Sequence, residues 1–306
     1  MPETPDRRRG DETTGKLLLL LLTLAWGVNW PSVKIALFEV GPWTFRVTGL
    51  AVGGLVVAAV VVLRGRSLLM PAGRIWAHVA IAGFFNVAAF AIFSTFALRD
   101  TTSSRVVILV YTMPIWSTLL ARLLLGEKLT VLRLLALALC TSGLAVLLAP
   151  HMPLPDSSLW YALATAWVWA AGTIYMKWAR IQADAMTIAF WQIAIGWAGV
   201  AAAATILGEP WFVWPQYTQT IVAWIYSSVF GVGLAYFMWF AVIERLSAST
   251  ASLGSLMIPV VGVASSALLL GERPTLHDMV GFAFVFAAAA CVLLQPSRNL
   301  AAARGR

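Results

Sequence analysis

Long apolar stretches are the feature of this sequence that most narrows its fold. A bilayer is crossed by a helix of roughly 20 mostly apolar residues, and ten segments of about this length alternate here with short polar breaks. Because the chain is 60% hydrophobic and 11% charged, a soluble domain could not bury so much apolar surface. Lipid offers no partner for unpaired backbone groups, so the segments are predicted to be helices of an all-α integral membrane protein. They cover residues 17–38, 42–63, 75–98, 102–125, 130–149, 158–178, 186–207, 218–240, 247–270 and 276–295.

Two parts of the chain, 103–148 and 248–293, are rough copies at a fixed offset of 145 residues. Pro114 falls on Pro259, and the letters Leu-Leu-Leu-Gly-Glu at 123–127 recur at 268–272. Each copy belongs to a half with five predicted helices, and an odd number of crossings turns the second half upside down. The sequence therefore predicts two inverted five-helix repeats. We divide the chain into an N-terminal tail (1–16), a first repeat (17–149), a linker (150–157), a second repeat (158–295) and a C-terminal tail (296–306).

The basic residues are unevenly distributed between the two sides of the predicted membrane protein. With a cytoplasmic N-terminus, sixteen Lys and Arg fall in internal segments and helix ends, and five fall on the other side. This asymmetry follows the positive-inside rule, so both tails are expected in the cytoplasm. The net charge of +8 therefore needs no nucleic-acid partner to explain it.

The acidic residues set the strongest limit on chemistry. All thirteen Asp and Glu fall in tails, loops or helix ends, and the three histidines also lie near the ends. A proton-coupled pump usually needs a titratable group inside the membrane, so coupling through an embedded carboxylate is disfavoured. The spans contain no HExxH, Gly-x-Ser-x-Gly or Cys/His cluster, which argues against an enzyme, a metal site and a cofactor.

Three prolines interrupt the predicted spans. Pro114 and Pro259 lie near the centres of the fourth and ninth spans, and Pro31 lies in the first. Proline lacks an N–H, so the carbonyl four residues earlier loses its usual hydrogen-bond donor. For Pro114 this is the carbonyl of Val110, and for Pro259 it is that of Ser255. A plain kink is the ordinary explanation for one proline. For a pair at equal depth, a hinge or cavity role is about equally favoured, so we treat all three as candidate hinges.

Amides and indoles inside the spans are the candidates for a substrate cavity. Asn29 and Asn86 need several hydrogen-bond partners, so bonding between helices and cavity lining are comparably favoured for them. Fifteen tryptophans are an unusually large number, and many fit an interfacial belt. Trp26 and its repeat counterpart Trp167 lie deeper, although packing against lipid explains any single one equally well. For Lys34, at the end of the first span, snorkelling is favoured over contact with a substrate carboxylate. The full candidate set is Trp26, Asn29, Trp30, Asn86, Tyr111, Trp167 and Ser255.

Three motifs together carry a family resemblance over residues from about 15 to 295. They are Leu-Ala-Trp-Gly-Val-Asn-Trp-Pro at 24–31, the Met-Pro and Ile-Pro of the fourth and ninth spans, and the Leu-Gly-Glu turns at 125–127 and 270–272. With ten helices as five plus five, the chain resembles the EamA-type branch of the drug/metabolite transporter superfamily. The resemblance implies a multi-pass carrier of the plasma (bacterial inner) membrane, commonly an exporter of amino acids, with aromatic amino-acid exporters closest in character.

The expected function is export of amino acids, aromatic or otherwise amphipathic, and of related small metabolites by alternating access. A carrier of sugar phosphates or nucleotide sugars is an alternative, but it should place Lys or Arg in the cavity. A multidrug or organic-cation exporter and a non-transporting membrane scaffold are also compatible with the sequence. The expected partners are a small-molecule substrate and the lipid bilayer, and the sequence is compatible with a monomer.

Overall fold

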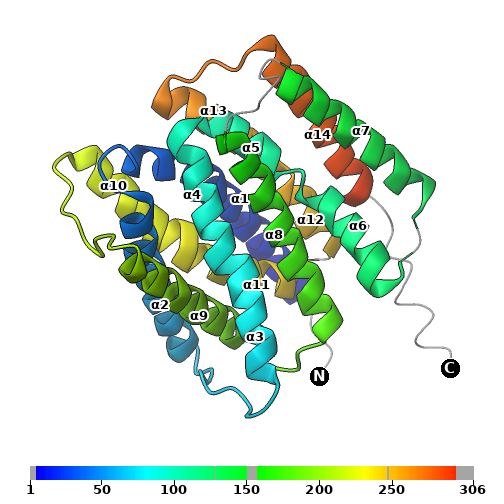
Figure 1. Cartoon of the computed structure of the whole chain (residues 1–306). Helices are drawn as coiled ribbons and strands as arrows, with labels where there is room; N and C mark the ends of the chain where they lie inside the picture. Colours follow the sequence, from blue (N-terminus) through cyan, green and yellow to red (C-terminus); the bar gives the residue numbers. More distant parts are fainter. Residues whose placement is uncertain (1–4, 128, 150–156, 247, 294–306) are drawn as a thin grey trace.

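A computed structural model describes residues 5–127, 129–149, 157–246 and 248–293 (Figure 1). Every regular element within these ranges is helical. The predicted C-terminal tail and all of the predicted linker except Ser157 lie outside the described residues. The first half contains α1 (Pro5–Ala36), α2 (Pro42–Leu63), α3 (Ile75–Gly83), the π-helical η1 (Phe84–Ala89), α4 (Phe90–Asp100), α5 (Ser103–Val110), α6 (Met113–Leu125) and α7 (Val131–Leu148). The second half contains α8 (Ser157–Ala179), α9 (Ala185–Ile206), α10 (Thr218–Tyr226), the π-helical η3 (Ser227–Leu234), α11 (Ala235–Arg245), α12 (Ala248–Ser255), α13 (Met257–Leu270) and α14 (Leu276–Leu293).

Each predicted span coincides with one helix or with a run of consecutive helical segments. Within the described ranges, six runs are long and apolar enough to cross a bilayer, and three further apolar helices are shorter. The total of ten crossings stays a prediction. The six runs are Glu12–Ala36, Pro42–Leu63, Ile75–Asp100, Ser103–Leu125, Ala185–Ile206 and Thr218–Ile243.

The first helix begins earlier than expected. α1 starts at Pro5, inside the stretch that we expected to be a tail. Farther along α1, the exposed side chains of Lys16 and Glu12, one helical turn apart, form an ion pair of 2.6 Å between Nζ and Oε1. Ion pairs at this spacing stabilise a helix by a few tenths of a kcal/mol. A search for long apolar stretches does not detect such a polar helical turn.

The fourth and ninth predicted spans are broken helices. α5 ends at Val110 and α6 begins at Met113, while α12 ends at Ser255 and α13 begins at Met257. Pro114 and Pro259 therefore lie in the first turns of the restarted helices, where the missing N–H costs little. The matched interruptions are confirmed, but their role as hinges stays a prediction. Pro31, in contrast, lies inside α1, which continues through it.

Both restarted helices end in the Leu-Gly-Glu turn. Gly126 has φ of 68° and Gly271 has φ of 66°, so each ends its helix in the left-handed conformation. Residues with a side chain avoid this region, and glycine is the usual helix terminator there. The left-handed backbone conformation thus explains why the sequence motif has a glycine in both copies.

The main helix–helix contacts of the two halves correspond to one another. α7 and α14 lie side by side along one flank, and α2 and α9 pack together on the opposite flank (Figure 1). Between them, α1 packs against α13 and the run α10–η3–α11, while α8 packs against α6 and the run α3–η1–α4. α2 also contacts η3, and α9 contacts η1. The two crossings α1–η3 and α8–η1 bring together the polar groups described next.

Candidate functional site

At the first crossing, polar groups of α1 meet the π-helical segment η3. Trp26 Nε1–H donates a hydrogen bond of 3.2 Å to the carbonyl of Gly231. The hydroxyl of Tyr226 donates one of 3.2 Å to the carbonyl of Ala25. The Asn29 amide lies directly over Gly231 and occupies the space that a Cβ would need. Asn29 Oδ1 is buried and has no hydrogen-bond partner among the described residues.

The second crossing also packs an asparagine against a glycine, but the two residues have changed places between the α-helix and the π-helical segment. Here the asparagine belongs to the π-helical segment, because Asn86 of η1 lies over Gly172 of α8. Asn86 Nδ2 donates a hydrogen bond of 3.2 Å to Gln192 Oε1 on α9, and Gln192 Nε2 lies 3.8 Å from Met176 Sδ. Asn86 Oδ1, like that of Asn29, is buried and finds no hydrogen-bond partner in the part of the chain that the structure describes. Buried polar atoms usually have partners, so two such carbonyl oxygens mark this pair of crossings.

The π-helical segments are features that the sequence did not reveal. The repeat match of Ala91 with Ala235 corresponds to an offset of 144 residues, which carries η1 onto residues 228–233, inside η3. π-helical turns are rare and occur often at functional sites. The only sequence signal was the weak echo of residues 91–97 at 235–241, which gives equivalence but no helix type.

The remaining candidates occupy different places. Tyr111 lies at the break between α5 and α6, where the adjacent Thr112 accepts a hydrogen bond of 3.1 Å from Trp116 Nε1. Trp30 is half-buried and packs against the apolar cluster between α1, α5 and α8. Ser255 ends α12, at the other helix break.

Trp167 does not lie beside Trp26. Its side chain is 43% exposed, the most exposed of the seven candidates, and its ring stands edge-on to Phe85 with centroids 6.2 Å apart. The ring next to Trp26 is that of Trp239, at 6.0 Å. The structure thus brings Trp26 and Asn29 together on α1 and joins Asn86 to α8 and α9, but it does not pair the two repeat-related indoles.

The carbonyl that Pro31 leaves without its usual N–H donor lies against α13. Pro31 cannot donate to the Gly27 carbonyl. Ser265 Oγ of α13 lies 3.4 Å from the Gly27 oxygen and 3.1 Å from the Gly262 oxygen, so the two carbonyls share its one hydroxyl proton. Gly27 also packs tightly against Val261 of α13. The proline of α1 therefore contributes to the contact between the first and ninth predicted spans.

Arg46 on α2 is a buried cation that the sequence reasoning overlooked. Its side chain is 8% exposed, and its Nε donates to the Ala91 carbonyl (3.0 Å) and to Thr95 Oγ1. Its Nη2 donates to Ser94 Oγ (3.0 Å), and the guanidinium carbon lies 5.0 Å from the Phe45 ring centre. These neutral groups of α4 tie α2 to the helix that follows η1. The available signal was an arginine inside the second predicted span.

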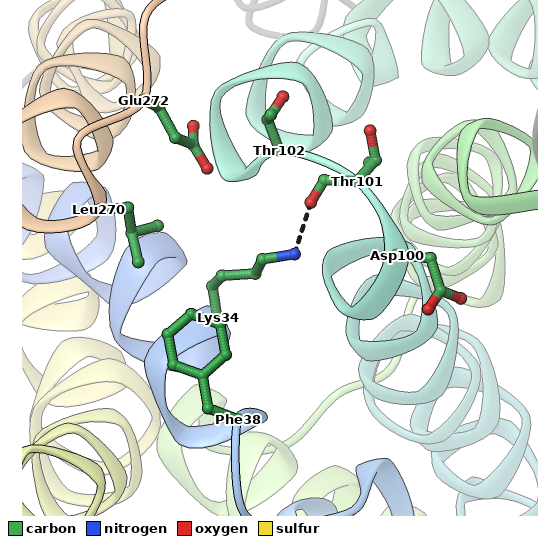
Figure 2. A pocket seen from close by; sticks show the side chains of 7 residues that line it. All are labelled: Lys34, Phe38, Asp100, Thr101, Thr102, Leu270 and Glu272. Atoms are coloured by element: carbon green, nitrogen blue, oxygen red, sulfur yellow. Dashed lines mark hydrogen bonds between the residues drawn. The ribbon is translucent and has the colours of Figure 1, made fainter.

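A pocket of about 430 Å³ opens at the end of the molecule where α1, α13 and the α4–α5 connection meet. None of the seven candidates lines it. Lys34 Nζ donates hydrogen bonds to the carbonyls of Arg99 (3.2 Å) and Thr101 (2.9 Å), so its ammonium is held by the protein rather than snorkelling freely (Figure 2). The pocket is lined by Lys34, Phe38, Asp100, Thr101, Thr102, Leu270 and Glu272.

The two Gly-Glu turns hold their carboxylates differently. Glu127 accepts from Lys177 Nζ (2.6 Å) and from Arg133 Nη2 (2.9 Å). The hydrogen bond from Lys177, and then the one from Arg133, hold the pKa of Glu127 below its ordinary value despite partial burial. Glu272 instead accepts from the first backbone N–H groups of α5. Because helix N-termini carry unpaired N–H groups and a partial positive charge, they can replace a cation here.

Comparison with known proteins decides the family. The model of the EamA-like transporter family matches the chain twice, over residues 13–149 and 156–294. The chain belongs to the EamA-like transporter family. The "Uncharacterized transporter YvbV" of Bacillus subtilis (strain 168) is 27% identical over 302 residues, which cover 96% of this chain and 96% of that protein. The "Probable amino-acid metabolite efflux pump" of Escherichia coli (strain K12) is 25% identical over 279 residues, covering 87% and 90%. A solved crystal structure that is 22% identical shares the fold over 91% of this chain and 96% of that one, with a TM-score of 0.63.

As a member of this family, the EamA-type protein is a multi-pass membrane transporter of the drug/metabolite class. The family match extends across both crossings described above. For an EamA transporter, groups buried between packed helices from different halves are the natural place to look for the substrate path.

Proposed function

We propose that this EamA-family protein exports amino acids, aromatic or otherwise amphipathic, together with related small metabolites. The observation that carries the proposal is the pair of crossings at which Asn29 and Asn86 bury unpartnered carbonyl oxygens beside π-helical segments. Carbonyl acceptors and the indole of Trp26 suit an ammonium group, through hydrogen bonds and cation–π contact. The relative from Escherichia coli that is named an amino-acid metabolite efflux pump supports the same substrate class.

The mechanism that we propose is alternating access between two inverted five-helix halves in a plasma (bacterial inner) membrane. Three features support it: the double family match, the correspondence of the main helix contacts of the two halves, and the matched helix breaks before Pro114 and Pro259. Rocking of one half against the other would expose a central site to each side in turn. Pro31, Pro114 and Pro259 are the proposed hinges, and both tails are placed in the cytoplasm.

The proposed transport follows the substrate gradient without an embedded acid. Three carboxylates of the described residues illustrate this placement at helix ends and turns: Glu127 after α6, Glu272 after α13 and Asp278 in the first turn of α14. The amide and indole candidates change no charge between neutral and mildly acidic pH. Substrate binding at the two crossings is therefore expected to be independent of a proton gradient.

Transport in proteoliposomes tests this proposal. Purified protein is reconstituted into liposomes, and separate batches of liposomes are loaded with each amino acid of a panel. Counterflow is then measured with and without an imposed pH gradient. We expect counterflow of aromatic or other amphipathic amino acids at a rate that the gradient leaves unchanged. Counterflow with no member of the panel would overturn the substrate class, and strong dependence on the gradient would overturn the uncoupled mechanism.

A carrier of phosphorylated solutes is the second candidate, and Arg46 is the observation that favours it. Among the residues that the structure describes, the buried guanidinium has only neutral hydrogen-bond partners, and an anion normally accompanies a buried cation. Those neutral partners nevertheless occupy Nε and one terminal nitrogen. The same liposomes loaded with sugar phosphates separate the two candidates.

A further inference from the structure

A lysine and a glutamate lie close together at each end of the molecule, but only one of the two pairs is in direct contact. At one end, Glu127 of the first Gly-Glu turn forms a direct ion pair of 2.6 Å with Lys177, in the last turn of α8. At the other end, Glu272 of the second turn faces Lys34, in the last turn of α1. In both cases the lysine ends the first helix of one half and the glutamate follows the broken helix of the other half.

The second lysine and glutamate are parted. Within the described part of the chain Lys34 forms no ion pair, because its ammonium donates to the carbonyls of Arg99 and Thr101. Glu272 is held away from it by α5: Oε1 accepts from Ser103 N (2.6 Å), while Oε2 accepts from the N (2.9 Å) and Oγ (2.6 Å) of Ser104. Figure 2 shows the Lys34 ammonium directed at the Thr101 carbonyl, with the Glu272 carboxylate apart from it in the same pocket.

Both parted groups keep hydrogen-bonding capacity toward the pocket. An ammonium has three N–H groups, and two of those on Lys34 are used. A carboxylate oxygen has two lone pairs, and Glu272 Oε1 accepts one hydrogen bond. Asp100 is already bound by Arg99 through three contacts of 2.8 to 3.0 Å, and Figure 2 shows its carboxylate turned away from Lys34. Apolar surface is supplied by Phe38.

We propose that this pocket is a binding site for a zwitterionic amino acid, which bridges the parted Lys34–Glu272 pair. The substrate carboxylate would take the remaining N–H of Lys34, its ammonium would donate to Glu272 Oε1, and its side chain would lie on Phe38 and Leu270. A ligand carrying several negative charges is disfavoured, because it would meet the Glu272 carboxylate beside Lys34. This inference rests on the proposed function and adds a second site, at the helix ends, to the central crossings.

Binding to the wild-type protein gives the first test and needs no variant. L-phenylalanine, L-phenylalaninamide and 3-phenylpropanoate are titrated by calorimetry into the protein in lipid nanodiscs. The amide lacks the carboxylate, and the propanoate lacks the ammonium. A charge-assisted hydrogen bond corresponds to about tenfold or more in affinity, so each analogue is expected to bind at least about tenfold more weakly than the amino acid. Equal binding of all three, or no binding of the amino acid, would overturn the site.

Variants then test whether Lys34 binds the substrate carboxylate and Glu272 the substrate ammonium. Lys34→Met is expected to weaken binding of phenylalanine about tenfold and to leave that of phenylalaninamide unchanged. Glu272→Gln is expected to weaken phenylalanine and to leave 3-phenylpropanoate unchanged. Lys34→Arg keeps the positive charge and is expected to retain binding. Retained binding would show that the effect of Lys34→Met comes from the lost charge and not from the substitution itself. Arg273→Met is the matched control, because it removes an exposed cation next to Glu272 that does not line the pocket.

The outcomes separate this site from the proposed function. If Lys34→Met weakens the amino acid and its amide equally, or weakens neither, the site is wrong. When liposomes still show amino-acid counterflow in that case, the export function stands without the pocket. Absence of counterflow with every amino acid is the separate failure of the function itself.

Discussion

Asn29 and Asn86 each press a carboxamide onto a glycine of the opposite half, Gly231 and Gly172 respectively. Neither glycine stands out in a chain with 23 of them, and the asparagines alone left bonding and cavity lining equally favoured. The structure gives the pairs a shared geometry, in which the absence of a Cβ lets an amide reach the neighbouring backbone. Small residues allow this close approach wherever membrane helices cross.

The fit at Gly172 can be tested by adding one methyl group. Gly172→Ala places a Cβ in the space of the Asn86 amide, so we expect the free energy of unfolding to fall by about 1–3 kcal/mol, as for overpacking. Thermal unfolding in detergent measures the change. Gly199→Ala is the control, because nothing lies within 4 Å of its added Cβ. Adding Asn86→Ala to Gly172→Ala should recover part of the loss; equal stability of both single variants would contradict the packing.

Broken helices that end in a Gly-Glu turn are the recurrent element of this molecule. The break lies at Tyr111 in one copy and at Leu256 in the other, and the turn glycine has a left-handed backbone in both. The glutamate that follows has diverged in its partners, because position 133 is arginine in the first copy and its counterpart 278 is aspartate in the second. Arg133 binds Glu127, whereas Asp278 binds Arg105 at 2.7 Å.

The turn itself makes a prediction about backbone strain. Gly271 has φ of 66° and nothing within 4 Å of an added Cβ, so Gly271→Ala tests the left-handed conformation alone. We expect a loss of about 1–2 kcal/mol in the free energy of unfolding. Gly41→Ala is the matched control, since Gly41 has φ of −61° and is equally open. A loss that is the same for both variants would count against the role of the turn.

At the scale of the whole molecule, the main helix–helix contacts of the first half have counterparts in the second. α7 and α14 stand together on one flank, while α1 and α8 each cross a π-helical segment of the other half. The inverted arrangement that we predict would place the connections of each half on alternate sides of the membrane. It therefore predicts which loops face the cytoplasm.

Thiol labelling in intact cells tests the orientation. In a background with Cys140→Ala and Cys291→Ala, Gln216→Cys should react with a membrane-impermeant reagent from outside. Gln182→Cys should react only after the cells are permeabilised. Both side chains are exposed, so accessibility reports the side of the membrane rather than burial. The reverse pattern would place the tails outside and contradict the charge-based orientation.

Much of the fold could be predicted because lipid leaves few choices. Apolar length located the helices, and the matched prolines located the breaks before Pro114 and Pro259. Helix one was predicted to start too late, since the polar turn around Glu12 is helical without being apolar. For the candidate site, Trp26 and Asn29 do lie together, whereas Trp167 contacts Phe85 instead of Trp26.

The sequence by itself determined the helical class, the duplication and the family, because all three follow from patterns along the chain: apolar length, a repeated motif and its spacing. Only the tertiary structure decided which glycine each asparagine meets, where the π-helical segments lie and that Lys34 is parted from Glu272. These features depend on contacts between residues far apart in the sequence. Such contacts are set by how closely two helices approach, and a linear pattern carries no record of that distance.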